Sequence, residues 1–348
     1  MIMETNVYSK SITAWGAEHP ETVVLSADLG TSCEIMEFKK NYPDRYFSLG
    51  IAEQNMIGWA AGLAREGFLP YLHSFGVFLY RRVLDQVEMS VAYGNLPVGL
   101  VGFVPGLTTP GGVSHQSTND IGTLRSVPNM RIYSIADATD IEGFLPMAYE
   151  AGGPFYVRML RKSVPRLFPA NEPIQFNHAR IAAEGSDVAL FTENIATEEG
   201  LKAVKVLQNH GVSVQMLSVS TLKPFTDPQV VDALKKTKYG AVTYENHNII
   251  GGLGTCVAEV MAENGIGKPL IKVGVDDLYT HGASKMFLLK KYNVDAMSCI
   301  KAVEKLIGKD LGIEESEIEA VRFEDFNGVA YRSPSTGAVT DSYRRRFI

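Results

Sequence analysis

The sequence predicts an α/β protein with two doubly wound, mainly parallel sheet domains in tandem. Short, continuously apolar runs alternate with longer amphipathic runs along its 348 residues, as expected for parallel strands covered by helices on both faces. A chain of this length corresponds to about two domains. Three prolines within residues 163–173 interrupt the alternation and indicate a linker between two such series.

The first series precedes this linker. Helices are expected where apolar residues recur at helical spacing, and Gly67 ends the first of them. The expected strands are residues 22–27, 45–49, 68–72, 98–104, 131–134 and 155–159, and the expected helices are residues 53–66, 77–93 and 137–151.

The second series follows the linker and repeats the alternation. Its expected strands are residues 188–192, 212–219, 240–244 and 270–275, and its expected helices are residues 197–210, 227–236, 254–264 and 298–307. The two series define predicted domains at residues 1–165 and 174–310, followed by a polar extension at residues 311–348.

The composition excludes several classes of protein. A net charge of −6 argues against broad nucleic-acid binding, which requires a basic face. Residues 89–119 contain no Asp, Glu, Lys or Arg, but six glycines and three prolines there exclude a membrane helix and indicate loops near a buried site. The first fifteen residues carry no apolar signal segment. Cys33, Cys256 and Cys299 form no CxxC pair, which favours a reducing cytoplasm over a disulfide framework or a zinc site.

Glu53 is the first candidate for chemistry, because it follows a short strand that ends at Gly50 and lies in the first turn of the next expected helix. One interpretation is that it complements the helix dipole, as many first-turn acids do. The other is catalytic. The helix behind it, which includes Met56 and Trp59, looks buried on most sides, and a poorly solvated carboxyl group can share a proton with a ring nitrogen.

Aromatic residues and a histidine follow along the chain. Phe75, Phe78 and Arg82 recur at spacings of three and four, so they are expected on one side of a helix. The two phenylalanines form either a platform for an aromatic ring or part of the core. His115 follows a loop rich in Gly, Pro and Thr, and it either transfers a proton or holds a polar substrate, or it has no function.

Arg158 and Arg161 end the last strand of the first series. They either bind a carboxylate or phosphate or form local salt bridges. Glycines within residues 251–254 at a helix start are a weak indication of an anion site, and no Walker A, GxGxxG, HExxH or GxSxG motif accompanies them. No carboxylate cluster suggests a metal site.

Several segments, in this order, resemble the C-terminal half of transketolase, which is its pyrimidine-binding domain followed by its C-terminal domain. They are SADLGTS, GIAEQNMIGWAAGLAREGFLPY, SHQ, LRSVPNM and ENHNIIGGLG, and the resemblance runs from about Asn6 to Gly308. Deoxyxylulose-phosphate synthase and the β subunit of 2-oxoacid dehydrogenase E1 share much of this pattern.

The resemblance implies a site for thiamine diphosphate, a cofactor that acts as nucleophile and electron sink. Glu53 matches the glutamate that hydrogen-bonds the pyrimidine ring nitrogen and promotes the imino tautomer. Phe75 and Phe78 match aromatic residues that pack on the pyrimidine. Asp28 matches an acid near the cofactor and the subunit interface.

The resemblance also implies substrate contacts. His115 matches a histidine that contacts substrate oxygen near the reacting carbons, and Ser32 and Arg161 match residues that contact the sugar phosphate. Ordinary transketolase carries a histidine, an aspartate and an arginine at three further positions, which here fall on Phe103, Gly111 and near Thr5. Arg161 is therefore expected to be the main anion contact, and the usual pentose phosphate substrates are in question.

The sequence contains no Gly-Asp-Gly, the segment that in this family holds the divalent metal and the diphosphate. The resemblance therefore implies a split enzyme in which a separate N-terminal, pyrophosphate-binding subunit carries Mg²⁺ or Ca²⁺, assembled as α2β2. The expected activity is transfer of a two-carbon ketol unit from a ketose, as a phosphate or another anionic sugar, to an aldehyde. The alternatives are a decarboxylating enzyme of the E1β or deoxyxylulose-phosphate synthase type, and a non-catalytic scaffold.

Overall fold

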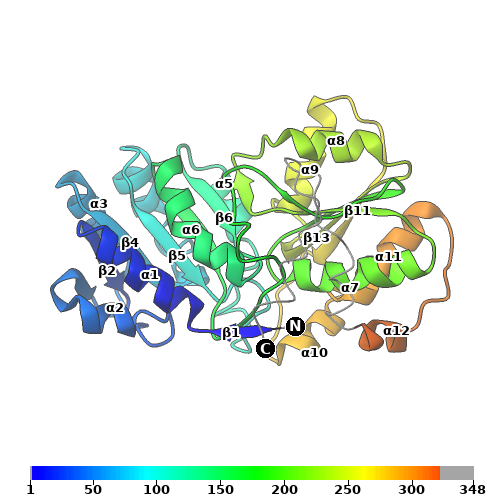
Figure 1. Ribbon diagram of the computed structural model, residues 1–348. Helices are drawn as coiled ribbons and strands as arrows, with labels where there is room; N and C mark the ends of the chain where they lie inside the picture. The colour runs from blue at the N-terminus through cyan, green and yellow to red at the C-terminus, as the bar shows by residue number, and fades with distance from the viewer. Residues whose placement is uncertain (1, 322–348) are drawn as a thin grey trace.

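The structure, a computed structural model, describes residues 2–321, so most of the predicted extension at residues 311–348 lies outside the described residues. Two α/β lobes lie side by side, the N-terminal half of the chain in one and the C-terminal half in the other (Figure 1). Each lobe is built on a mainly parallel sheet with helices on both faces. The predicted fold class is confirmed.

The sheet of the first lobe has seven strands within the described residues, in the order β12-β6-β7-β5-β4-β2-β3. All neighbouring strands are parallel except β12, which runs antiparallel to β6. Strands β2, β5 and β7 are buried along their whole length, which explains why their sequences are apolar without alternation. The strands are β2 (Thr22–Ser26), β3 (Tyr46–Ser48), β4 (Leu69–Phe75), β5 (Gly99–Phe103), β6 (Arg131–Ser134), β7 (Phe155–Met159) and β12 (Thr221–Lys223).

The sheet of the second lobe has five strands in the part of the chain that the structure describes, in the order β14-β13-β10-β11-β9. Only the edge strand β9 is antiparallel to its neighbour within these described strands. The strands are β9 (Arg180–Ala183), β10 (Val188–Thr192), β11 (Val214–Ser218), β13 (Gly240–Asn248) and β14 (Leu270–Val275).

Helices cover both sheets and enclose two apolar cores, each of which runs through both lobes. One core lies under α1, α6, α7 and α11, and the other under α3, α8 and α9. Asp137, Asp227 and Asp295 accept backbone N–H bonds in the first turns of α6, α8 and α11 and so fix where these helices begin. The helices are α1 (Val7–Glu18), α2 (Met36–Asn41), α3 (Glu53–Arg65), α5 (Asp120–Arg125), α6 (Ala138–Ala151), α7 (Ala196–Asn209), α8 (Pro228–Lys236), α9 (Leu253–Glu263), α10 (Lys285–Lys291), α11 (Ala296–Ile307) and α12 (Glu315–Ala320).

The single helix predicted for residues 77–93 is wrong. A 3₁₀ turn at Gly76–Phe78 and a non-helical stretch precede two short helical segments, Leu84–Gln86 and Val87–Ala92. The physical reason lies in contacts with a distant loop. Arg81 donates from Nη1 to the main-chain oxygen of Val113 at 3.0 Å, and the neighbouring Tyr80 hydroxyl donates to Asn119 Oδ1 at 2.6 Å.

Two strand pairs tie distant parts of the chain together. β12 comes from the C-terminal half of the sequence, yet it extends the first sheet beside β6. β1 (Met3–Thr5) pairs antiparallel with β8 (Ser163–Pro165), which is the first part of the predicted linker. The predicted domain limits near residue 165 remain an interpretation of the sequence, since a strand from beyond them completes the first sheet.

Arg158, in β7, joins the two lobes through a network with no access to solvent. Its Nε donates to Asp120 Oδ2 at 3.0 Å and its Nη1 donates to Glu193 Oε2 at 2.6 Å. Its Nη2 donates to the main-chain oxygens of Asn246 at 2.7 Å and Ser117 at 3.3 Å. Asp120 begins α5 in the first lobe, whereas Glu193 follows β10 and Asn246 lies in β13 of the second. Arg158 therefore forms buried salt bridges, as one interpretation of the sequence proposed, but its partners are distant in the chain and not local.

Replacing Arg158 should strongly destabilise the protein. We expect Arg158→Met to lower the free energy of unfolding by about 3–5 kcal/mol, because it leaves the carboxylates of Asp120 and Glu193 buried without a counter-charge. Urea denaturation followed by circular dichroism measures the loss. Lys236→Ala, which breaks the exposed Lys236–Glu184 pair, is the matched control and should cost less than about 1 kcal/mol. Equal losses in the two variants would contradict the interpretation.

Candidate active site

The predicted site residues lie at one edge of the first sheet, beyond the carboxyl ends of its parallel strands. Ligands of open α/β sheets bind at this edge. Glu53 is the first residue of α3, which follows β3. Further site residues are Ser32 after β2, Phe75 at the end of β4 with Phe78 in the next turn, His115 after β5, and Arg161 after β7.

Glu53 places a buried carboxyl group at this edge, with only 2% of the residue exposed. The Ser74 hydroxyl donates to Oε1 at 3.4 Å, and Arg82 Nη1 lies 3.4 Å from Oε2. Both contacts are long, and a carboxylate has about four lone-pair positions, so acceptor capacity remains for a ligand. The carboxyl group also sits where it complements the dipole of α3, so both interpretations fit the geometry.

Phe75 and Phe78 form an aromatic wall beside it. Their ring centroids lie 6.0 Å apart with planes 24° from parallel. The His115 ring lies 5.9 Å from Phe75 and 5.7 Å from Phe78. The guanidinium carbon of Arg82 lies 4.3 Å from the Phe78 ring centroid, and that of Arg161 lies 5.2 Å from the Phe75 centroid. A strand end followed by a 3₁₀ turn creates this grouping, not the helix side predicted from the spacing.

The loop that carries His115 runs from Val104 to Thr118 and is held by the second lobe. Asn246 Oδ1 accepts from the Leu107 N–H at 2.9 Å, and its Nδ2 donates to the Pro105 oxygen at 3.1 Å. Near the other end, the Thr280 hydroxyl donates to Gln116 Oε1 at 2.5 Å.

The contact between this loop and the second lobe is close. Gly106 has φ +53°, and a Cβ at this position would lie 2.2 Å from Asn246 Oδ1.

The sequence did not identify Asn246 or Ser74 as part of the site. Asn246 lies in the segment ENHNIIGGLG, where the resemblance offered a signal, whereas nothing in the sequence singled out Ser74.

Arg161 and Ser32 also meet, because Arg161 Nη1 donates to the main-chain oxygen of Ser32 at 3.0 Å. The contact uses the Ser32 main chain, not its hydroxyl. Asp28 follows β2 with φ 59° and an exposed side chain. Among the described residues, its carboxylate makes no hydrogen bond or ion pair, with Glu53 or with any other side chain.

The anion site suggested by the glycines at residues 251–254 is wrong. Glu245 occupies this helix start with its own carboxylate, whose oxygens accept from the N–H groups of Leu253 at 2.7 Å and Gly254 at 2.9 Å. Burial raises the pKa of Glu245 to about 8, although these two hydrogen bonds oppose the rise. The N–H groups of Leu253 and Gly254 are therefore not available to an external anion.

His73 lies near this edge but belongs to the core. Its Nε2 lies 2.7 Å from the Tyr8 hydroxyl and its Nδ1 lies 3.3 Å from the Leu25 oxygen. Burial lowers the pKa of His73 to about 4, so its ring is uncharged at neutral pH.

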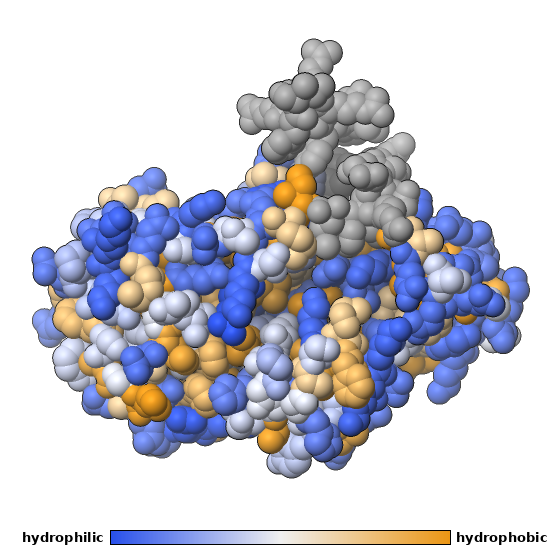
Figure 2. All heavy atoms as spheres, turned by 90° about the horizontal axis from the view of Figure 1, so that it is seen from below, coloured by the Kyte–Doolittle hydropathy of each residue, from blue (hydrophilic) through white to orange (hydrophobic). Residues whose placement is uncertain are grey.

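The outward side of α3 is open to solvent. Trp59 is 46% exposed and Ile51, just before the helix, is 77% exposed. The prediction that this helix is buried on most sides is therefore wrong, because a helix on a sheet buries one side only. Positions for a Cβ on Gly58 and Gly62 meet no atom within 4 Å. Seen from below, small groups of apolar side chains are exposed among hydrophilic ones (Figure 2).

Residues 2–321 contain no group of three or more His, Cys, Asp or Glu side chains placed to hold a metal ion. None of their helices has the length and apolar character needed to cross a membrane.

Known proteins are similar to this chain over most of its length. Residues 1–166 match the transketolase pyrimidine binding domain, and residues 177–299 match the transketolase C-terminal domain. The 6-deoxy-6-sulfo-D-fructose transketolase subunit SqwH of Clostridium sp. strain MSTE9 is 35% identical over 302 residues, which are 86% of this chain and 93% of that protein.

Two further proteins are similar over nearly their whole length. A putative transketolase C-terminal section of Methanocaldococcus jannaschii is 34% identical over 306 residues, which cover 87% of this chain and 96% of that protein. A solved structure described as a split gene transketolase, inactive beta4 tetramer, has a TM-score of 0.81 at 34% identity and covers 88% of this chain and 99% of that chain. The chain belongs to the transketolase family and is homologous to the C-terminal subunits of split transketolases.

Proposed function

We propose that this chain is the C-terminal subunit of a split, thiamine diphosphate-dependent transketolase that transfers a two-carbon ketol unit from an anionic ketose to an aldehyde. The observation that carries the proposal is the buried Glu53 carboxyl group at the same sheet edge as the stacked Phe75 and Phe78 rings. His115 and Arg161 contact those rings. A non-catalytic scaffold has no need of this combination.

The side chains at this edge fit the pyrimidine half of the cofactor that the family implies. Glu53 keeps acceptor positions for a ring N–H, and the aromatic wall offers π faces to a planar ring. Glu53 would hold a proton at the pyrimidine ring nitrogen and so fix the tautomer. When bound, thiamine diphosphate supplies the carbon nucleophile and the electron sink for cleavage of the ketose carbon–carbon bond.

His115 is proposed to act on the substrate. Its half-buried ring lies beside the aromatic wall, so it can hold a proton at a hydroxyl or carbonyl oxygen of the sugar. Ser32 and Arg161 lie together and are proposed to contact the anionic end of the sugar. Asp28 is proposed to lie near the cofactor and the subunit interface.

The diphosphate and its Mg²⁺ or Ca²⁺ are proposed to be held by a separate N-terminal subunit in an α2β2 assembly. The sequence contains no Gly-Asp-Gly, and the relatives named as subunits or sections match this chain over more than nine-tenths of their length. Trp59 in α3 and Ile51 just before it are exposed, and they provide apolar surface for such a partner.

Reconstitution tests the proposed function. Mixed with its N-terminal partner, thiamine diphosphate and Mg²⁺, the chain should transfer a ketol unit from a ketose donor to an aldehyde, measured by chromatography of the products. The chain alone should show no sub-micromolar cofactor binding in calorimetry, because it would supply only the pyrimidine half of the site. Turnover of a 2-oxoacid with release of CO₂ in place of ketol transfer would favour a decarboxylating enzyme and reject the proposal.

Glu53→Gln should reduce kcat of the reconstituted pair by at least about a hundredfold, because an amide cannot hold and return the proton at the ring nitrogen. Steady-state kinetics give kcat, and circular dichroism checks the fold. Glu66→Gln, the same change just after the opposite end of α3, is the matched control and should retain full activity. An active Glu53→Gln enzyme would remove this residue from the mechanism.

Asn246→Ala should lower kcat about ten- to a hundredfold, because it frees one end of the His115 loop and small displacements of reacting groups are costly. The apparent affinity for thiamine diphosphate should change little, since Glu53, Phe75 and Phe78 lie outside this loop. Titration of the reconstituted pair with cofactor separates the two effects. Asn264→Ala, at the end of α9, is the control in the same lobe. A parallel loss of cofactor affinity would point to general damage instead of loop positioning.

A further inference from the structure

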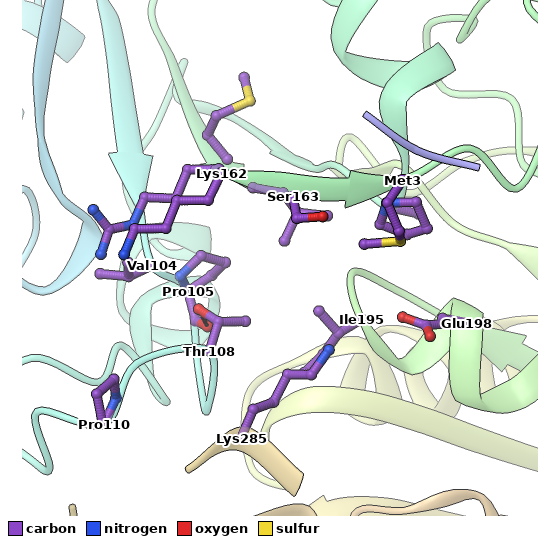
Figure 3. Close-up of a pocket in the computed structure, with 15 residues that line it drawn as sticks. Met3, Val104, Pro105, Thr108, Pro110, Lys162, Ser163, Ile195, Glu198 and Lys285 are labelled. Carbon is purple, nitrogen blue, oxygen red and sulfur yellow. Dashed lines mark hydrogen bonds between the residues drawn. The ribbon is translucent and has the colours of Figure 1, made fainter. Parts of the chain in front are cut away.

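A cavity of about 190 Å³ is lined by residues of both lobes, among them Arg161 of the candidate active site. Figure 3 shows its lining side chains. A cavity holds one water molecule once it offers about 10–15 Å³, so this one has room for a group of several atoms. Its walls come from the first lobe around the ends of β5 and β7 and from the starts of α7 and α10 in the second lobe. The lining residues on which the argument depends are Val104, Thr108, Arg161, Lys162, Ser163 and Lys285.

The charges around this cavity are mainly positive. Arg161, Lys162 and Lys285 line it, and Lys285 projects from α10 toward the cavity from the second lobe (Figure 3). Glu198 is its only acidic lining residue within residues 2–321, and Lys202 Nζ already lies 3.3 Å from its carboxylate. No ion pair within the described part of the chain engages the ammonium groups of Lys162 and Lys285. Apolar walls strengthen the attraction of these cations for an anion.

Backbone conformation sets the same cavity apart. Val104, just after β5, has φ 53°, and Lys162, just after β7, has φ 64°. A left-handed conformation is unfavourable for a residue with a side chain, and most of all for a β-branched one such as valine. Such residues cluster at functional sites, where the surrounding structure holds them in place. Both of these line the cavity.

Arg161 connects the cavity with the candidate active site. Its guanidinium carbon lies 5.2 Å from the Phe75 ring centroid, while the residue also lines the cavity. A linear sugar whose reacting end lies beside Phe75 and His115 would therefore extend its far end toward this group of cations. The resemblance places Phe103, and a position near Thr5, where transketolase has a histidine and an arginine, so fewer cationic side chains are expected from the first lobe.

We propose that this cavity binds the phosphate or sulfonate end of the sugar donor, and that Lys285 of the second lobe is a specificity-determining residue for that charge. The inference rests on the proposed function. It adds a substrate contact from the C-terminal domain to those implied for the first lobe. Thr108 and Ser163 offer hydroxyl donors beside the cations.

The test compares three ketoses of the same chain length in the reconstituted pair: the 6-phosphate, the 6-sulfo analogue and the uncharged sugar. Lys285→Gln should reduce the preference for either anionic donor over the uncharged one by about ten- to a hundredfold, the size of one charge-assisted hydrogen bond. The loss should appear in KM more than in kcat. Lys291→Gln, on the same helix but outside the cavity lining, is the control. An unchanged preference in Lys285→Gln would overturn the inference while the proposed function stands.

A second measurement separates the inference from the proposed function. Inorganic phosphate and inorganic sulfate are titrated into the full chain by calorimetry, with and without Lys285→Gln. Binding that the substitution weakens at least about tenfold supports an anion site in this cavity even if no ketol transfer is found. Binding of only one of the two ions identifies which anionic group the cavity accepts. No binding to the wild-type chain, together with an unchanged donor preference, would reject the site.

Discussion

The fully buried guanidinium of Arg158 fixes how the two lobes meet. Taking a charge out of water is costly unless partners neutralise it and saturate its hydrogen bonds, and here Asp120 comes from one lobe and Glu193 from the other. The planar guanidinium of an arginine can donate to all of these partners in one geometry only. Because Nη2 also donates to main-chain oxygens of both lobes, a small rotation of one lobe would leave buried groups unpaired.

The candidate active site depends on this junction. Asn246 donates its main-chain N–H to Glu193 and accepts a hydrogen bond from Arg158 at its main-chain oxygen. Its side chain holds the start of the loop that carries His115. The second lobe, which contributes no residue to the aromatic wall, thus positions the histidine beside that wall. The same junction leaves the cation-lined cavity between the lobes, so stability and the proposed substrate contacts arise from one interface.

Much of the fold followed from local patterns. Buried parallel strands are apolar along their length, and helices begin at aspartates such as Asp137 and Asp227. Most of the predicted elements therefore lie within a few residues of their observed limits, whereas several elements, such as α1, were not predicted. The failures share a physical cause. The helix predicted after residue 77 is broken by contacts that Tyr80 and Arg81 make with a loop more than thirty residues away. β12 is only three residues long, and its strand conformation depends on pairing with β6 of the first lobe.

The sequence by itself determined the α/β class, the family resemblance and the residue types at the site, because periodicity and motifs are properties of neighbouring residues. It left the role of Arg158 open and did not indicate that Ser74 belongs to the site. It also suggested an anion site at residues 251–254, where the carboxyl group of Glu245 lies. Only the tertiary structure decided these points. A carboxylate, an arginine and the first turn of a helix can each pair with several kinds of group. Which group is present depends on segments that meet in space after folding.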